Sequence, residues 1–389
     1  MSPLSLGVSV KVGYEQQTGR LTATRGAAMR GQTRLHRLLK PFQADLDMIA
    51  ATAEPSMRAL RGRRIFLTGC TGFIGKWLIN SLLWGNETLA LQLGLIVVTR
   101  DAARFLEAMP HLRCREDVVF VQGTWAAPRD GDIPDFDLAV HALNIYPAPG
   151  ADWQAKHMGE LVRAADALYG LAAAKGCSTV LFTSSGAVYG TGQCAAPPYA
   201  EEQIPLVPSA PAGDVYGETK RFLEKYCVAL GSAHDIRTVV ARCFAFAGAH
   251  FPLNGHNALG TFIEDAHAGR DIYIQGDGKE IRSYLYAADM AVWLLTLLAS
   301  GGHGKAYNVG SERAVSLEDL AWLILRCAGS SAGVVIGNGR TQGNAPAVYV
   351  ADTRRIREEF GLVETVSLEK ALVSTLAWHK RVTQEPNGS

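Results

Sequence analysis

The chain has 389 residues, of which 48% are hydrophobic and 19% charged, and its formal net charge is +1. This balance is typical of a globular protein that buries a sizeable core. A charge close to zero argues against a nucleic-acid partner and against a strongly anionic partner surface. No apolar run reaches the ~18 residues of a membrane span, so neither a membrane nor a nucleic-acid partner is expected.

The seven cysteines are scattered, odd in number and without Cys-x-x-Cys spacing. This usage is typical of reduced thiols in a cytoplasmic protein and predicts no metal site. Residues 1–28 lack the apolar core of a signal peptide, and we expect a basic, poorly ordered leader there. Between residues 35 and 60, apolar side chains such as Phe42, Leu46 and Ile49 recur at helical spacing, which predicts a helix lying on the main domain.

From Arg63 onward, apolar strands alternate with helices, which predicts a doubly wound parallel sheet of the Rossmann type with helices on both faces. The expected strands are Ile65–Thr68, Leu95–Thr99, Val118–Val121, Leu138–Ala142, Val180–Thr183 and Thr238–Arg242. The helices expected between them are 76–93, 101–108, 154–175 and 214–231.

After about residue 245 the pattern changes to a polar loop, short strands and further helices. We expect a smaller C-terminal substrate-binding lobe, interwoven with the sheet domain, and a ligand between the two at the carboxyl ends of the strands. The expected divisions are a leader and helical segment at 1–60, the dinucleotide-binding domain at 61–245, the lobe at 246–380 with returns to the sheet, and a tail at 381–389. Within the lobe, the expected helices are Phe262–Ala268, 288–299 and 316–328, and the strands are Ile272–Gln275 and Arg282–Tyr286.

The first expected strand runs into three glycines spaced by two residues, and an amphipathic helix follows. A strand, a tight glycine turn and a helix N-terminus form a cradle for the pyrophosphate of a dinucleotide. Glycine is needed because the backbone must approach phosphate closely. The residues expected to contact the cofactor here are Gly69, Thr71, Gly72, Phe73, Ile74 and Gly75.

A second constellation lies far downstream. Tyr216 and Lys220 are four residues apart on an expected helix, so both project from one face. Ser185 follows the apolar strand Val180–Thr183, where the sheet presents active-site groups. A nearby ammonium and a positively charged nicotinamide would each favour the phenolate of Tyr216. Together these residues predict hydride transfer, with Tyr216 moving the proton and Ser185 bonding the reacting oxygen.

The end of the second strand bears on the choice of cofactor. An acid there would hold the ribose 2′-hydroxyl of NAD. Arg100 stands at that position and would pair with a 2′-phosphate, whereas Asp101 is one place later. We therefore expect NADP(H) to be favoured, with NAD(H) as the alternative.

These motifs resemble those of the nucleotide-sugar epimerase/dehydratase family of extended short-chain dehydrogenases/reductases, over about residues 60–380. The resemblance rests on the stretches 68–75, 184–190, 282–289 and 307–310 and on Tyr216-x-x-x-Lys220. It implies that Ser185, Tyr216 and Lys220 are catalytic and that the substrate is a nucleotide-diphosphate sugar. It also implies a homodimer that forms through helices 154–175 and 214–231. The positions that it assigns to substrate binding are Ser184, Asn257, Arg282 and Arg340.

Three departures from the family pattern matter. Family members that are 4,6-dehydratases carry an Asp-Glu pair after the catalytic hydroxyl residue, where this chain has Gly186 and Ala187. Neither residue moves a proton, so a dehydratase of that kind is disfavoured. Ala245 replaces a common substrate-binding asparagine, and Thr124 stands where an aspartate often holds the adenine.

The sequence leaves several activities open. A 4-ketoreductase that uses exchangeable NADPH is favoured, and a 4-epimerase that keeps NAD(H) bound is close behind. A nucleotide-binding regulator without catalysis is the alternative from a different class, since the fold alone does not imply activity. A reductase of non-sugar carbonyls is disfavoured by Arg282 and Arg340, which suit a diphosphate.

Overall fold

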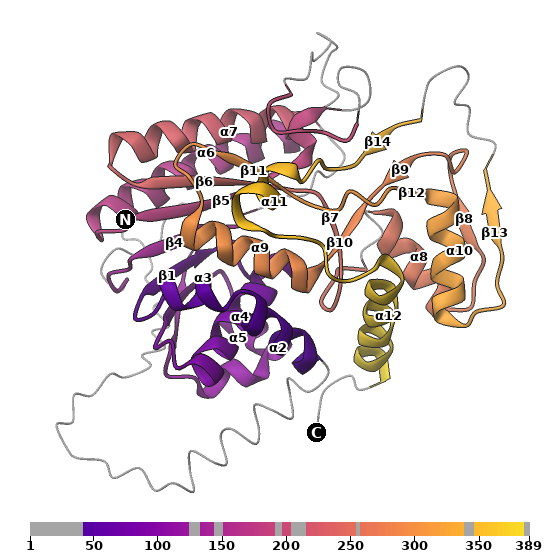
Figure 1. The fold of residues 1–389 in the computed structure, drawn as a ribbon, viewed down its shortest axis with the longest axis horizontal. Coiled ribbons are helices and arrows are strands. Elements are labelled where there is room, and N and C mark those ends of the chain that lie inside the picture. Colours follow the sequence, from indigo (N-terminus) through magenta and orange to yellow (C-terminus); the bar gives the residue numbers. More distant parts are fainter. Residues whose placement is uncertain are drawn as a thin grey trace, which may run out of the picture. The chain divides into compact units, whose positions relative to one another are not determined.

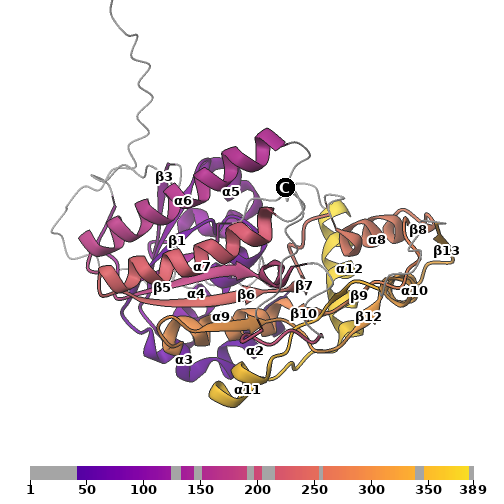
Figure 2. The same ribbon diagram turned by 90° about the horizontal axis from the view of Figure 1, so that it is seen from above.

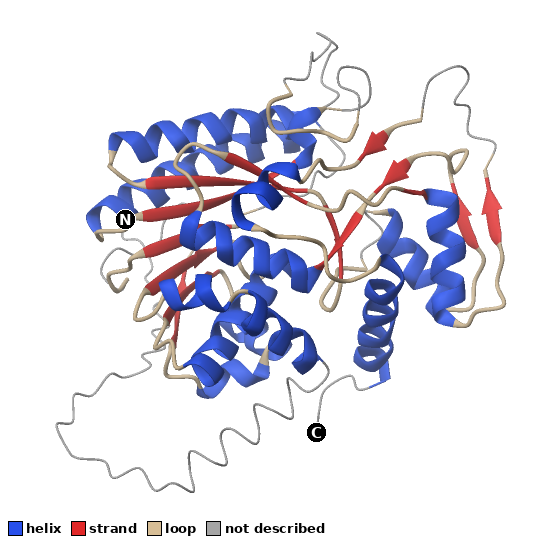
Figure 3. Cartoon of the chain, viewed as in Figure 1, coloured by secondary structure: helices blue, strands red, loops and turns tan. Residues whose placement is uncertain are grey.

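The computed structural model describes residues 42–123, 133–143, 151–190, 197–203, 215–253, 257–337 and 346–384, without the side chains of Cys114, residues 151–157 and residues 383–384. Its centre is a sheet of seven parallel strands in the order β11-β6-β5-β4-β1-β2-β3. Figure 3 shows these strands side by side with helices on both faces. The strands are β1 (Arg64–Thr68), β2 (Gly94–Thr99), β3 (Val118–Gln122), β4 (Leu138–His141), β5 (Thr179–Ser185), β6 (Arg237–Cys243) and β11 (Ala306–Val309).

Helices cover both faces of this sheet (Figure 1). On one face lie α6 (Ala151–Ala174) and α7 (Val215–Ala233), which also pack against each other, as Figure 2 shows. On the other face lie α4 (Phe73–Leu89), α5 (Ala102–Ala108) and α9 (Ala287–Ser300). Phe66, Phe182 and Leu223 belong to the core between the sheet and the α6–α7 layer. The prediction of a doubly wound parallel sheet is therefore confirmed.

The strand order reverses between β1 and β4, which are neighbours in the sheet although two strands separate them in sequence. The chain leaves these two strands in opposite directions, and the crevice above their carboxyl ends is where doubly wound sheets bind ligands. The glycine loop follows β1, and Leu143 follows β4. The topology thus places the loop at the same edge of the sheet as Ser184 and Ser185, which end β5.

A smaller lobe of short strands and helices is formed by the C-terminal part of the chain (Figure 1). Its sheets have the orders β10-β7, β12-β9-β14 and β13-β8. The strands are β7 (Ala245–Ala247), β8 (Ile272–Ile274), β9 (Ile281–Arg282), β10 (Tyr284–Tyr286), β12 (Val315–Ser316), β13 (Val334–Ile336) and β14 (Val348–Tyr349). The helices are α8 (Ala258–His267), α10 (Leu317–Ala328) and α12 (Leu368–Gln384), while α11 (Arg354–Phe360) packs on β11.

In the described residues that precede the sheet domain lie the helices α2 (Gln43–Thr52) and α3 (Glu54–Ala59). They pack on α4 and α9, and Leu46 and Ile49 are fully buried in this contact. The Asp45 carboxylate accepts a hydrogen bond from the Tyr286 hydroxyl at 2.7 Å. A helix lying on the main domain was expected within 35–60. In the described part of this range, from Phe42 onward, the path turns at Ala53, just before Pro55, and so divides α2 from α3.

Candidate active site

The glycine loop fits tightly against its surroundings at two of its three glycines. Gly69 has φ +71°, and a Cβ there would lie 2.3 Å from Leu143 N. A Cβ on Gly75 would lie 2.0 Å from the Cys70 carbonyl oxygen. No side chain fits at either position, so these two glycines let the turn pack against the chain that leaves β4 and against itself.

The third glycine faces open space. A Cβ on Gly72 would meet nothing within 4 Å, and Gly72 lines the cavity described below. Gly72 is also the N-cap of α4 and has an extended backbone without a side-chain cap. The first N–H groups of a helix have no partner within it and attract anions. The loop therefore fits the pyrophosphate of a dinucleotide, held by the backbone of Gly72, Phe73 and Ile74.

A cavity of about 930 Å³ begins at this loop, passes the ends of β2, β4, β5 and β6, and reaches the small lobe. Its lining includes nearly every residue that the sequence assigned to a site. These are Gly69, Thr71, Gly72, Phe73, Ile74, Gly75, Arg100, Ser184, Ser185, Tyr216, Lys220, Asn257 and Arg282. Arg340 and Thr124 lie outside the described residues, and Asp101 is not part of the lining.

The two residues after β2 have different surroundings. Arg100 is exposed and lines the cavity at the end of β2. Asp101 is the N-cap of α5, and its carboxylate accepts a hydrogen bond from Arg104 N at 2.9 Å. The Asp101 side chain is thus committed to the helix, whereas the Arg100 guanidinium is the charged group beside the site.

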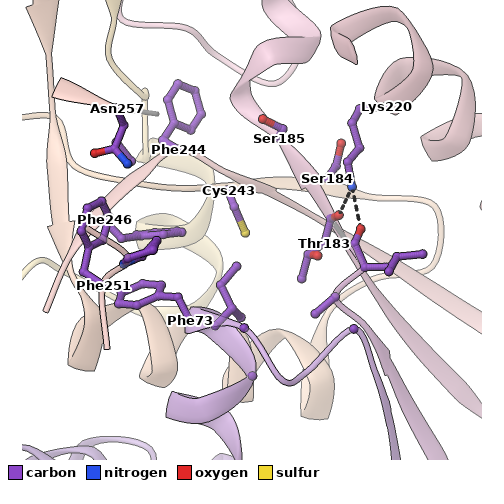
Figure 4. A pocket seen from close by; sticks show the side chains of 18 of the residues that line it. Phe73, Thr183, Ser184, Ser185, Lys220, Cys243, Phe244, Phe246, Phe251 and Asn257 are labelled. Carbon is purple, nitrogen blue, oxygen red and sulfur yellow. Dashed lines mark hydrogen bonds between the residues drawn. The ribbon is translucent and has the colours of Figure 1, made fainter. Parts of the chain in front are cut away.

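Lys220 is almost fully buried and lines the cavity. Its Nζ donates hydrogen bonds to Leu143 O at 3.2 Å and Thr183 O at 3.1 Å (Figure 4). The ammonium also lies 5.2 Å from the ring centre of Phe182. Burial lowers the pKa of Lys220 to about 8, so the group is mostly charged at neutral pH. Tyr216 lies one turn earlier on α7 and is half-buried at the cavity wall.

The neighbouring serines of β5 have different partners. Ser184 Oγ donates to Glu224 Oε1 at 2.6 Å, and Arg242 Nη2 donates to Glu224 Oε2 at 2.8 Å. The hydroxyl proton of Ser184 is therefore held by the protein, and its contact with a substrate stays a prediction. Ser185 Oγ accepts from Ala187 N at 3.2 Å, and Ser185 lies at the cavity surface.

At the far end of the cavity, Arg282 and Glu280 lie side by side in the small lobe. Arg282 Nη2 donates to Glu280 Oε2 at 2.6 Å, and Arg282 Nη1 donates to the Ile281 carbonyl at 3.0 Å. These contacts hold the guanidinium at the cavity wall. Asn257 is the N-cap of α8, and its Oδ1 accepts from Gly260 N at 2.7 Å.

Of the aromatic part of the wall, sequence reasoning identified Phe73 alone. Phe73, Phe246 and Phe251 pack together, with ring centres 6.2 Å and 5.7 Å from Phe73, and Phe244 lies nearby (Figure 4). Tyr349, which the sequence did not assign to the site, also lines the cavity. These residues come from four separate segments, so no local sequence spacing predicts that they lie together.

Comparisons with known proteins agree with this geometry. A model of the NAD-dependent epimerase/dehydratase family matches residues 65–310. The dTDP-glucose 4,6-dehydratase of Streptomyces griseus is 26% identical over 323 residues, which cover 82% of this chain and 94% of that one. The UDP-glucose 4-epimerase of Azospirillum brasilense is 29% identical over 238 residues, 56% of this chain and 65% of that one. Dehydratases and epimerases are thus both among its relatives.

Solved structures share the fold. The UDP-glucuronic acid 4-epimerase of Bacillus cereus, in complex with UDP-glucuronic acid and NAD, has a TM-score of 0.69 to this chain at 20% identity. The match covers 82% of this chain and 99% of that one. Among the described helices, none combines the length and apolarity needed to cross a membrane. The chain belongs to the NAD-dependent epimerase/dehydratase family and is an enzyme of the extended short-chain dehydrogenase/reductase type, whose relatives act on nucleotide sugars.

Proposed function

We propose that this enzyme is an NADP(H)-dependent reductase of the C4 carbonyl of a nucleotide-diphosphate sugar. The observation that carries the proposal is the composition of the one cavity that joins the glycine loop to the small lobe. It brings together Ser185, Tyr216 and Lys220, with Arg282 at the far end. The residues after Ser185 are Gly186 and Ala187, so no carboxyl group follows it to eliminate water.

Each residue has a distinct part in the reaction. The bound nicotinamide supplies the hydride. Tyr216 gives its phenol proton to the oxygen of the substrate carbonyl, and Ser185 donates a hydrogen bond to the same oxygen. The buried ammonium of Lys220 favours the phenolate that Tyr216 becomes, because an opposite charge nearby stabilises the ionised form. Arg282 binds a phosphate oxygen of the nucleotide, a role that suits a planar guanidinium.

The surroundings of Arg100 and Asp101 support NADP(H). Asp101 caps α5 through one carboxylate oxygen and is not part of the cavity lining. Arg100 lines the cavity at the position where a 2′-phosphate would lie. The NAD in the Bacillus cereus structure belongs to that protein, and its presence there favours the alternative cofactor.

A 4-epimerase is the second candidate, because 4-epimerases occur among both the relatives and the solved structures of this fold. It would use the same three residues and return the hydride to the other face of the sugar. Mass spectrometry of the nucleotide released from the denatured protein separates the two. NADP(H) or an empty site, followed by stoichiometric NADPH oxidation with a 4-keto nucleotide sugar, would support the reductase. NAD(H) at about one per chain, with interconversion that needs no added cofactor, would identify an epimerase.

Catalysis itself is tested by Tyr216→Phe. Loss of a general acid costs on the order of a hundredfold or more in turnover. We expect that loss with cofactor binding kept, since the glycine loop is untouched. Full activity of the variant would remove Tyr216 from the mechanism. A wild-type protein that binds cofactor and turns over no sugar nucleotide would favour the regulator.

We further propose that the enzyme is a homodimer in which α6 and α7 form the contact. Phe222 on α7 has 51% of its surface exposed, and its ring stacks on Tyr226 with centres 5.3 Å apart. Aromatic side chains such as the exposed Phe222 are enriched at protein–protein interfaces.

A further inference from the structure

Tyr349 lines the cavity, although it is far from Ser185, Tyr216 and Lys220 in sequence. It ends β14, which pairs with β9 so that Tyr349 is opposite Arg282. Its ring packs on Phe244 with centres 4.8 Å apart. Tyr349 lines the cavity together with Ser185 and Tyr216, and both residues lie close enough to the Tyr349 phenol to affect its pKa. A third hydroxyl therefore stands beside the two that the mechanism uses.

Gly186 makes room for this hydroxyl. A Cβ at residue 186 would lie 2.6 Å from the Tyr349 hydroxyl and 2.9 Å from two ring atoms of Phe244. Any side chain at this position would displace the phenol from Ser185. The absence of a side chain at residue 186 thus lets Tyr349 pack beside Ser185. It also removes the acidic residue that dehydratases of the family carry at this position.

The hydrogen-bonding capacity of Ser185 decides what this contact does. A serine hydroxyl has one proton and two lone pairs. One lone pair of Ser185 Oγ accepts from Ala187 N at 3.2 Å. If the second accepts from Tyr349, the only group left on Oγ is its proton, which is then free to be donated into the cavity.

We propose that Tyr349 is a positioning residue of the reacting centre: its phenol donates to Ser185 Oγ and so commits the Ser185 proton to the substrate oxygen. This inference rests on the proposed carbonyl reduction, in which that oxygen gains negative charge and is stabilised by a donor. Burial raises the pKa of Tyr349 above its usual range. The phenol therefore keeps its proton at neutral pH and remains a donor.

The experiment is a double-mutant cycle of Tyr349→Phe and Ser185→Ala, measured in two ways. The first is the urea midpoint of the cofactor-free protein, which reports the contact without any substrate. The second is kcat and KM for the 4-keto nucleotide sugar that the wild type reduces. The matched control is Tyr307→Phe, which removes a buried phenol whose bonds, from Gly302 N and to Glu359, lie outside the cavity.

We expect Tyr349→Phe to lower kcat on the order of tenfold, the factor for one lost hydrogen bond, with KM unchanged. In the Ser185→Ala protein the same change should cost nothing further, and the urea midpoints should be equally non-additive. Gly186→Ala should lose the same factor as Tyr349→Phe, whereas Tyr307→Phe should keep kcat.

Additive urea midpoints would overturn the contact, and an unchanged kcat in Tyr349→Phe would overturn its role. A loss of kcat that is equally large in the Ser185→Ala protein would also overturn the proposal, because Tyr349 would then act independently of Ser185. A wild type that reduces no nucleotide sugar would contradict the proposed function instead. The double-mutant cycle measured by urea unfolding would then test the contact between Tyr349 and Ser185 by itself. Additive midpoints would overturn the contact, and non-additive midpoints would support it.

Discussion

Arg100 and Asp101 are adjacent in sequence, yet only the first borders the cavity. A guanidinium bonded to a phosphate contributes about 1.5–3 kcal/mol, because charged hydrogen bonds are stronger than neutral ones. We therefore expect Arg100→Ala to weaken NADP(H) binding by roughly tenfold or more and to leave NAD(H) binding unchanged. Titration of both cofactors measures the effect.

Asp101→Ala is the control for that titration. It removes the N-cap of α5, which costs about 1 kcal/mol of stability. It should leave the ratio of the two affinities as it is. An Arg100→Ala protein with an unchanged NADP/NAD preference would refute the assignment of Arg100.

The burial of Lys220 predicts how the free energy of unfolding changes with pH. Its pKa is about 8 in the folded protein, lowered from 10.5 mainly by burial. Between these two values the unfolded chain binds more protons than the folded one, so stability rises with pH. In the cofactor-free protein, the unfolding free energy of the wild type minus that of Lys220→Met should rise by at most about 3 kcal/mol from pH 7.5 to 10.5. Urea unfolding measures this difference, and a flat or falling difference would contradict the burial of a charged lysine.

The candidate site was predictable wherever its chemistry is local in sequence. Gly69 to Gly75 form one turn, and Tyr216 and Lys220 share a helix face, so spacing alone places them. Tyr349 and Glu280 were not predictable, because the pairing of β9 with β14 brings them to the cavity. The commitment of Asp101 to a helix cap and of Ser184 to Glu224 was equally hidden. Sequence spacing shows which residues are neighbours but not where a hydroxyl or carboxylate donates or accepts.

Among the elements, α7 carries Tyr216 and Lys220 of the proposed catalytic set, and a buried polar cluster fixes it to the sheet. Glu224 lies one turn beyond Lys220 and accepts from Ser184 on β5 and from Arg242 on β6. The Arg242 and Glu224 side chains are 14% and 9% exposed. Because both charges are largely buried, removing either one would leave the other buried without an opposite charge.

Removing one partner of this pair should therefore be costly. We expect Glu224→Ala to lower the unfolding free energy by about 3 kcal/mol, since it leaves the Arg242 charge buried without its partner. The matched control on the same helix is Glu218→Ala. Its ion pair with Arg221 is more exposed, with 45% and 24% of the two side chains accessible, and should contribute less than about 1 kcal/mol. Equal urea midpoints for the two variants would show that the cluster does not fix α7.

Most of the main-sheet elements were predictable because their apolar runs are long and regularly spaced. The short strands were not. The expected strand Arg282–Tyr286 is two strands, β9 and β10, that pair with different partners. Strand β11 completes the main sheet from within the C-terminal part of the chain and was not expected as a strand. Such pairings depend on contacts between distant segments, which the spacing of apolar residues does not encode.

At the scale of the whole molecule, α6 and α7 form one layer on one side of the sheet (Figure 2), and α6 packs against the helix that carries Tyr216 and Lys220. A dimer through this layer would place α7, with Tyr216 and Lys220, directly beneath the contact between subunits. The rigidity of the catalytic helix would then depend partly on assembly. This gives the proposed dimer a consequence for activity as well as for size.

Phe222→Glu tests that assembly. A charge in the centre of an apolar contact is buried without a partner, which is costly enough to dissociate it. We expect the wild type to sediment as a dimer at micromolar concentration and the variant as a monomer with reduced turnover. The control is Tyr273→Glu, because Tyr273 on β8 is 56% exposed in the small lobe, away from α7. The control should remain dimeric. A monomeric wild type, or a Phe222→Glu protein that is still a dimer, would place the contact elsewhere or exclude it, and α7 would then owe its position to the Glu224 cluster and the sheet alone.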